Sequence, residues 1–292
     1  MYYRLACLFV VGFFFFNIVA LKANANTLLR ISTWNLDWLI DGNTPSNRLP
    51  LDRPYRSLQD YQALAVYAAR LKSDIVAAQE VGSVAVLTRL FPTTTYQILL
   101  SNDTIPQHTA LIARKQFILH RNPDLVALSI GSENTPTLRN GLDVTVTFPN
   151  IPDKKLRILI VHLKTGCWDN SPWKHRYSCP VLYRQFAILK RWIKARIKEN
   201  AAFAIIGDFN RRLTPEDPLF LALSKITPLD LTTANRSSPC RGGEYFIDHI
   251  ILGGTAITWE KPNSLRVMRI PQHNGETLSD HCPVSITLNI PS

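Results

Sequence analysis

The segment IIGDFNRR, residues 205–212, places an acid and an amide two positions apart at the end of an apolar run. Gly, Asp and Asn are common turn residues, so one interpretation is a strand that simply ends in a turn. The other is a catalytic edge, because residues two apart on an extended segment, here Asp208 and Asn210, direct their side chains to the same side. Phe209 between them would then face apolar surroundings. Polar residues elsewhere in the chain decide between these interpretations.

Other polar residues able to bind a metal ion or transfer a proton also lie where apolar runs end. A lone carboxylate at such a position is usually a cap or a surface charge. Several together indicate a functional site, because α/β proteins bind ligands where strands end and a rigid sheet fixes the side chains there. We therefore predict that they meet in one cleft around a divalent cation. Besides Asp208 and Asn210, the set comprises Asn35, Glu80, His162, Asp248, Asp280 and His281.

The apolar pattern of the whole chain predicts an α/β protein. Several predicted strands follow one another without a helix between them, which a purely parallel sheet does not allow. Two packed mixed sheets covered by helices accommodate this order. Runs at helical spacing predict helices at 57–72, 83–90, 182–197 and 218–224. Short apolar or alternating runs predict strands at 30–36, 74–79, 96–100, 109–114, 125–130, 142–148, 156–163, 203–207, 245–252, 265–269 and 283–288.

The 292 residues are 46% hydrophobic and carry a net charge of +11, which provides for a substantial core in a basic chain. Residues 1–25 have a basic start, an apolar middle and Ala-Asn-Ala at 23–25, which predicts a cleaved secretion signal. An uncleaved membrane anchor is the alternative, because the apolar stretch is nearly long enough to span a bilayer. We expect residues 26–292 to form one secreted or periplasmic domain. Its charge suits a polyanionic partner, or serves solubility alone.

Four cysteines remain after the predicted signal, and an even number in an exported chain favours two disulfides. Three pairings are possible. We favour Cys167 with Cys179, which closes a short loop and contributes about 3 kcal/mol, and by elimination Cys240 with Cys282; the alternative is free, buried thiols. The first loop mixes aromatic and basic residues, so Trp173 could stack on a nucleic-acid base. Its tryptophans could equally fold inward.

Six motifs, in order along nearly all of the predicted domain, resemble those of the endonuclease/exonuclease/phosphatase superfamily, the group that contains deoxyribonuclease I and exonuclease III. They are TWNLDWL, AAQEV, VHLKTG, IIGDFNRR, YFIDHIIL and LSDHCPV. Each motif is short, but the ordered set is specific. The resemblance implies a four-layer α/β sandwich, with two mixed sheets packed face to face and helices outside. This agrees with the predicted order of elements.

The resemblance also implies which residues hold the metal ion and the water. Glu80 corresponds to the principal metal ligand, with Asn35 and Asp280 completing or supporting the site. Asp208 and Asn210 correspond to the pair that orients the attacking water and contacts the scissile phosphate. Oxygen ligands favour Mg²⁺, with Mn²⁺ or Ca²⁺ as alternatives.

His162 and His281 match the two histidines of the superfamily that bind the phosphate and move protons, and Asp248 is the expected partner of His281. The assignment of acid and base to the two histidines stays open. His249, next to Asp248, should face the opposite side of its strand. Arg139 matches an arginine near the phosphate.

Three further cations follow catalytic motifs and could hold the substrate backbone: Lys164, Arg211 and Arg212. A solvated surface charge is an equal alternative for each of them.

The predicted function is an exported, metal-dependent phosphodiesterase, first of all an endonuclease that cuts DNA, and RNA as a further substrate, with little sequence preference. Contacts to the phosphate backbone carry no sequence information. One alternative is a phosphatase or sphingomyelinase-type phospholipase on the same scaffold, and another is a catalytically inactive binding protein. The sequence implies no obligate protein partner and no stable membrane association after the signal is removed.

Overall fold

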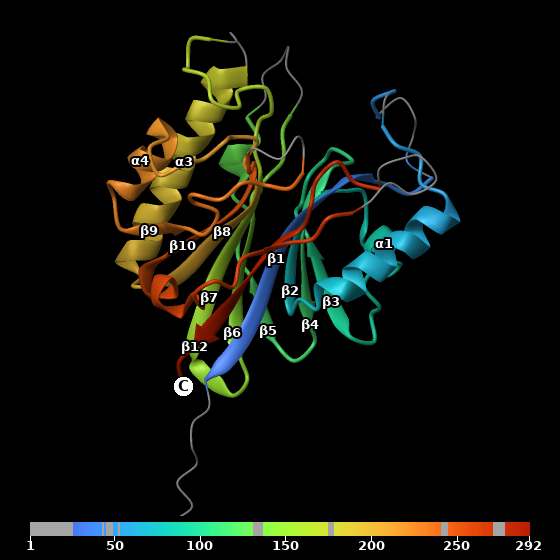
Figure 1. Ribbon diagram of the computed structural model, residues 1–292, viewed down its shortest axis with the longest axis horizontal. Coiled ribbons are helices and arrows are strands. Elements are labelled where there is room, and N and C mark those ends of the chain that lie inside the picture. The colour runs from blue at the N-terminus through green and yellow to red at the C-terminus, as the bar shows by residue number, and fades with distance from the viewer. Residues whose placement is uncertain are drawn as a thin grey trace, which may run out of the picture.

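The computed structural model describes residues 26–42, 44, 49–51, 53–130, 137–174, 178–240, 245–270 and 278–292. The predicted secretion signal, residues 1–25, lies outside the described residues. Two six-stranded sheets pack face to face, with helices on their outer faces (Figure 1). The predicted fold class, a four-layer α/β sandwich with two mixed sheets, is confirmed.

The first sheet has the strand order β11-β12-β1-β2-β4-β3. It is mixed, because β1 pairs parallel with β2 and antiparallel with β12. Helix α1, Leu58–Leu71, covers its outer face at the right of Figure 1 and begins at a capping box formed by Ser57 and Asp60. The strands are β1 Thr27–Leu39, β2 Ile75–Val81, β3 Tyr96–Leu100, β4 His108–Arg114, β11 Arg266–Val267 and β12 Val284–Ile290; the short helix α2 is Val84–Thr88.

The second sheet has the strand order β5-β6-β7-β8-β10-β9. It is also mixed, because β8 pairs parallel with β7 and antiparallel with β10. Helices α3, Ser178–Lys198, and α4, Pro218–Ser224, lie on its outer side at the left of Figure 1. The strands are β5 Ile118–Arg121, β6 Leu142–Phe148, β7 Ile151–His162, β8 Ala202–Asp208, β9 Leu229–Leu231 and β10 Asp248–Gly253; the 3₁₀ helices are η2 Val126–Leu128 and η3 Gly254–Trp259.

Three apolar clusters hold the layers together. The central cluster lies between the sheets and takes the inward side chains of both, such as Ile31 and Ile206. A second joins α3 and α4 to the second sheet, and a third joins α1 to the first sheet. Every residue of β8 is buried, because helices cover one face of this strand and the other sheet covers the opposite face. The strand that ends at Asp208 is therefore held on both sides.

One predicted element differs from the structure, and two strands were not predicted. Residues 125–130, predicted as a strand, form the single 3₁₀ turn η2, and only Leu125 makes a bridge, to Gly141. The prediction failed because Val126 is exposed at the surface instead of filling a sheet position. The edge strands β5 and β9 were not predicted, since runs of four and three residues are too short for a period to appear.

Both predicted disulfides are present, Cys167–Cys179 and Cys240–Cys282, with Cα–Cα distances of 4.9 and 6.1 Å. No helix among the described residues is long and apolar enough to cross a membrane.

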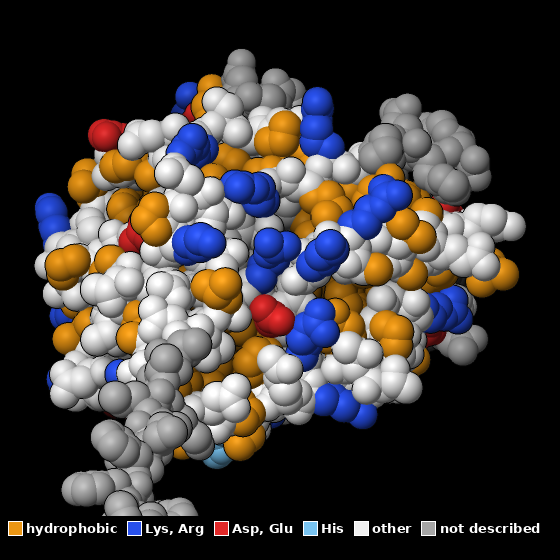
Figure 2. Space-filling view, turned by 60° about the horizontal axis from the view of Figure 1, so that its bottom comes forward, with side chains coloured by type: hydrophobic (Ala, Val, Ile, Leu, Met, Phe, Trp, Pro, Cys, Tyr) orange, Lys and Arg blue, Asp and Glu red, His pale blue; other side chains and the backbone are white. Residues whose placement is uncertain are grey.

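Lys and Arg side chains outnumber Asp and Glu on the face in Figure 2, which brings the bottom of Figure 1 forward. The positive charge is thus not confined to the end of the sheets that carries the predicted site, and charge alone does not locate a substrate surface.

Candidate active site

Strand pairing brings the predicted site residues to one end of the two sheets. The parallel pairing of β1 with β2 sets Asn35 beside the end of β2, where Glu80 lies. In the other sheet, His162 ends β7 and pairs with Asp208, which ends β8. Antiparallel pairing then sets Asp248, the first residue of β10, against Asp208 as well. Five strands from two sheets thus deliver polar side chains to a common edge.

The side chains meet across the gap between the sheets. Asn35 Nδ2 donates to Glu80 Oε1 at 3.0 Å and to Asp208 Oδ2 at 3.1 Å. His162 Nε2 lies 3.5 Å from Glu80 Oε1 and 3.6 Å from Asp208 Oδ2. One amide from the first sheet therefore links carboxylates of both sheets, and His162 lies against the same two oxygens.

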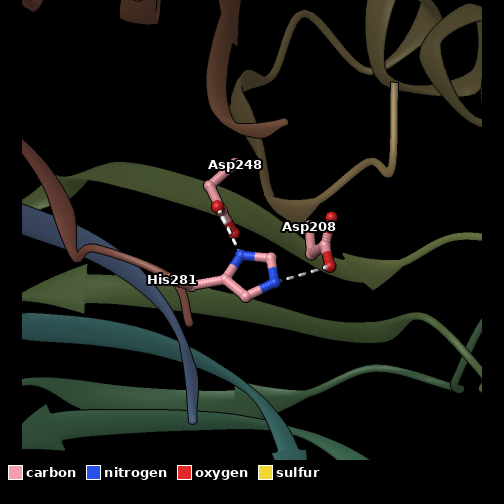
Figure 3. Close-up of side chains that lie close together, drawn as sticks. All are labelled: Asp208, Asp248 and His281. Carbon is pink, nitrogen blue, oxygen red and sulfur yellow. Dashed lines mark hydrogen bonds and ion pairs between the residues drawn. The ribbon is translucent and has the colours of Figure 1, made fainter. Parts of the chain in front are cut away.

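His281 lies between two buried carboxylates, as Figure 3 shows. Its Nδ1 is 2.7 Å from Asp248 Oδ2, and its Nε2 is 3.8 Å from Asp208 Oδ2. Asp280 Oδ1, on a half-exposed side chain, is 3.7 Å from the same Nε2. Ser279 fixes the segment, because its Oγ donates to the carbonyl of Asn35 and accepts from the backbone N–H of His281. The expected pairing of Asp248 with His281 is therefore present.

The two histidines differ in charge. Burial lowers the pKa of His162 well below its usual value, and the neighbouring Arg139 and His281 lower it further. Burial alone would also lower the pKa of His281, but Asp248, followed by Asp208 and Asp280, raises it to about 10. At neutral pH His162 is a neutral imidazole and His281 is an imidazolium.

Asp208 and Asn210 meet through a turn and not through an extended segment, so that premise of the prediction was wrong. Asn210 has φ of 49°, in the left-handed region that Asn tolerates better than most residues. Its backbone N–H donates to Asp208 Oδ1 at 2.8 Å, and its Nδ2 to Asp208 Oδ2 at 3.2 Å and to the carbonyl of Leu163 at 3.1 Å. Phe209 is buried and packs against Phe186, as expected for a residue that faces away from the site.

Local backbone features orient the side chains of the candidate site. Glu80 has φ of 60°, and the pairing of β2 with β4 shifts between Ala78 and Val81. A bulge of this kind turns a side chain away from the regular alternation of the strand. Next to Asp208, Gly207 has φ of 149°, and a Cβ on it would lie 2.0 Å from the carbonyl oxygen of Val161. Only glycine allows β7 and β8 to approach this closely beside the site.

Asp37 belongs to the site, although sequence reasoning missed it. It follows Asn35 by two positions, and its backbone N–H donates to Asn35 Oδ1 at 2.9 Å. Burial, followed by repulsion from Asp280, raises the pKa of Asp37 to about 6, and Glu80 adds to the effect. The signal was available in the motif TWNLDWL, where an acid among apolar residues follows the amide.

The donor set fits a hard divalent cation. Burial raises the pKa of Asp208 to about 7, an effect that the charge of His281 opposes and that of Asp248 supports. A cation would relieve the cost of crowding these carboxylates in a buried site. Ligand atoms of Asp208, Asp248 and His281 also lie within 4.8 Å of one another. Asp248 and His281 are engaged with each other, so the oxygens of Asp208 and Glu80 are the better candidates.

Asn35 lies in the predicted metal site, but it presents its amide nitrogen to both carboxylates while its oxygen accepts from Asp37. In this arrangement Asn35 positions Glu80 and Asp208. Its oxygen would reach a cation between them only after the amide turns over.

Arg139 borders the cluster, and Lys164 lies near Arg139. Arg139 donates to the carbonyl of Leu163 at 2.9 Å, the same oxygen that Asn210 contacts, and its buried Nε has no partner among the described residues. Burial lowers the pKa of Arg139, while Glu80 and Asp208 oppose this shift. Burial and the charge of Arg139 also lower the pKa of Lys164. Arg139 is therefore positioned to meet an anionic ligand.

The assignment of Arg211 to substrate binding was wrong. Its side chain is 1% exposed and forms an ion pair with Asp217 at 2.7 Å. It also donates to the carbonyls of Cys167 and Asn170, both at 2.8 Å. The backbone carbonyl of Arg211 contacts His249 Nε2 at 3.0 Å, which confirms that His249 faces away from the site. Arg211 therefore connects the disulfide loop to the turn at residues 208–210, and its buried guanidinium is not accessible to substrate.

Arg212 and Trp173 lie at the surface. Arg212 stacks on the ring of Tyr245 at 4.1 Å and pairs with the exposed Asp169 at 3.1 Å. Its backbone N–H donates to the carbonyl of Trp168, so the disulfide loop lies beside the turn at residues 208–210. Trp173 in this loop is 88% exposed. Of the two predicted orientations for the tryptophans, Trp173 takes the outward one.

Comparisons with known proteins identify the fold. TDP2 from Caenorhabditis elegans superposes with a TM-score of 0.62 at 18% identity, covering 91% of this chain and 75% of that one. TDP2 from D. rerio, in complex with a single-strand DNA product, gives 0.57 at 20% identity, covering 90% and 100%. An endonuclease/exonuclease/phosphatase family protein from Bacteroides thetaiotaomicron gives 0.57 at 15% identity, covering 91% and 99%.

No family model and no curated protein matches the sequence. The structural matches and the observed layers nevertheless agree, and this chain has the deoxyribonuclease I-like fold of the endonuclease/exonuclease/phosphatase superfamily.

Proposed function

We propose that this protein is an exported, divalent-metal-dependent phosphodiesterase that cuts nucleic acid, DNA first and RNA as an alternative, with little sequence preference. The observation that carries the proposal is the contact of Asn35 with Glu80 and Asp208, with His162 against the same two carboxylates. Such a cluster combines metal-binding oxygens with groups that hold and move protons.

Each group has a role in hydrolysis that its environment supports. A divalent cation, when bound by Glu80 and Asp208 with Asp37 or Asp280 nearby, would neutralise charge on the phosphoryl oxygens. The imidazolium of His281 and the guanidinium of Arg139 would bind the anionic phosphoryl group. Asp208, whose orientation Asn210 fixes, would position the attacking water beside that cation.

The export and the partner are part of the same proposal. Two disulfides suit an oxidising compartment, and the predicted signal supports secretion or delivery to the periplasm. The basic chain and the exposed aromatic and basic residues beside the site favour nucleic acid over a neutral lipid surface. The structure of D. rerio TDP2 with a single-strand DNA product supports this choice of substrate class.

The test uses residues 26–292 with plasmid DNA, RNA, sphingomyelin and inositol phosphates, with and without EDTA. We expect chelator-sensitive nicking of DNA that His162→Ala abolishes. His120→Ala, which removes an exposed histidine on β5, is the matched control and should retain full activity. Turnover of lipid or inositol phosphate alone would select the first alternative, and no turnover of any substrate would select the inactive binding protein.

A further inference from the structure

A groove leads away from His281 along the loops that follow β8, β9 and η3. It begins at a small hollow against Asp248 and His281 that Tyr245 and Phe246 also line. These two aromatic residues continue into a cavity of about 280 Å³ that reaches Arg212 and Arg236. The three hollows share lining residues, so they adjoin one another and form one path.

The far end of the path is a larger cavity of about 440 Å³. Arg236 and Phe246 line both this cavity and the one before it, and Asn263 and Arg266 close the far side. The proposed hydrolysis does not involve any residue that lines this larger cavity. A chain of nucleotides is long enough to fill this cavity while one of its phosphoryl groups lies at His281, whereas a small phosphoester is not.

Beyond the first hollow, which Asp248 and Asp280 line, the described lining of the path is basic, with Arg212, Arg236 and Arg266 against the single acid Glu216. Among the described residues Arg236 makes no ion pair, and the guanidinium of Arg266 donates only to backbone carbonyls. Arg212 pairs with Asp169, but the Asp169 side chain is 60% exposed, so water weakens this pair. The three charges remain available to a chain of phosphates.

The path also carries an aromatic surface. Tyr245 is 46% exposed, Arg212 covers its ring at 4.1 Å, and the buried Phe246 forms part of the wall. An exposed aromatic ring between arginines stacks bases whose faces are free, and the bases of a duplex are already stacked on one another. The lining therefore suits an unpaired strand better than a duplex.

We propose that this arginine groove, defined by Arg212, Tyr245, Arg236 and Arg266, binds several nucleotides of an unpaired strand on one side of the bond that is cut. This inference rests on the proposed function and narrows its substrate to single-stranded polynucleotides and unpaired ends. Arg236 and Arg266 contact phosphates, and Tyr245 stacks on a base.

The experiment measures kcat/KM for single-stranded oligonucleotides of increasing length, for a duplex of the same sequence, and for the small diester bis(p-nitrophenyl) phosphate. We expect kcat/KM to rise with length and single strands to exceed the duplex. Arg236→Gln with Arg266→Gln should lower the slope of log affinity against log salt by about 1.4, since each phosphate contact on a single strand contributes about 0.7. Tyr245→Ala should lower kcat/KM for long oligonucleotides roughly tenfold. Hydrolysis of the small diester should not change in the variant with Arg236→Gln and Arg266→Gln.

The matched control removes the same charge elsewhere, with Arg191→Gln and Lys194→Gln on the exposed face of α3. If the wild type cleaves oligonucleotides without length dependence, prefers the duplex, or responds equally to the groove and α3 substitutions, the groove proposal is wrong although a nuclease remains. If the wild type hydrolyses the small diester but no polynucleotide, the proposed function itself fails. All substituted side chains are exposed, so thermal unfolding should confirm a native fold in each variant.

Discussion

Asp248→Asn should lower the pKa of His281, and the structure gives the size of the effect on stability. In the wild-type protein Asp248 Oδ2 lies 2.7 Å from His281 Nδ1. Burial opposes the charged imidazole, yet Asp248, Asp208 and Asp280 raise the pKa of His281 to about 10. Asparagine keeps the shape of the side chain but removes the largest favourable charge. The pKa of His281 should therefore fall, and the imidazolium should be lost at neutral pH.

The sign of the stability change follows from linkage. A histidine whose pKa is raised on folding stabilises the protein fully below its unfolded pKa of about 6.5, and this contribution is lost as the pH rises toward the folded pKa. Between about pH 7.5 and about pH 9 the loss for one such group is at most about 2 kcal/mol, at roughly 1.4 kcal/mol for each pH unit. Asp208 has a pKa of about 7, so it is already largely deprotonated in this pH range and contributes little to the change in stability. Asp248→Asn should lose little over the same range.

The assay is urea unfolding of both proteins in EDTA, followed by tryptophan fluorescence at the two pH values. Activity should also fall. We expect kcat/KM on DNA to be about 10²- to 10⁴-fold lower in the variant, as for a general acid-base group that loses its orienting partner. An equal pH dependence of stability in the two proteins would refute the reasoning. So would an NMR titration of wild-type His281 with a pKa near its ordinary value.

Gly207→Ala should destabilise the fold by more than about 2 kcal/mol, because the new Cβ would lie 2.0 Å from a carbonyl oxygen of β7; chemical denaturation measures the loss, and a stable variant would contradict the geometry. Arg211→Leu should cost about 3–5 kcal/mol, since it leaves the buried Asp217 without its partner, whereas the double change with Asp217→Leu should recover part of that loss. Cys240→Ser with Cys282→Ser opens a loop with a sequence separation of 42 residues, which should lower the free energy of unfolding by about 4 kcal/mol in urea. The change should also reduce activity, because Cys282 follows His281. An unchanged kcat/KM would show that the disulfide does not position that histidine.

The part of the site that sequence reasoning recovered consists of residues next to strand ends. Glu80, His162 and Asp208 could be predicted because each follows an apolar run that forms a buried strand. Parallel neighbours end at the same edge of a sheet, so a polar residue at each end predicts proximity without any coordinates. The pairing of Cys167 with Cys179 was similarly accessible, because the short separation favours it.

The residues that sequence reasoning misjudged depend on local conformation. Arg211 looks like a substrate-binding cation in the sequence, but its guanidinium is enclosed by Asp217 and two backbone carbonyls. Asn210 looks like part of an extended segment, but its positive φ brings its side chain back to Asp208. Asp37 did not stand out, because its raised pKa arises from burial and then from the charges of Asp280 and Glu80, which lie far away in the chain.

The sequence by itself determined the α/β alternation, the strand ends that carry chemistry and the two cysteine pairs, because hydrophobic period and residue type act over a few neighbouring positions. Tertiary structure decided the charges. His162 is neutral and His281 is cationic although both are histidines at strand ends, since their ionisation depends on burial and on carboxylates from other strands. The arginine groove likewise exists only once Arg212 and Arg236, from two loops, and Arg266, from the short strand β11, line one surface.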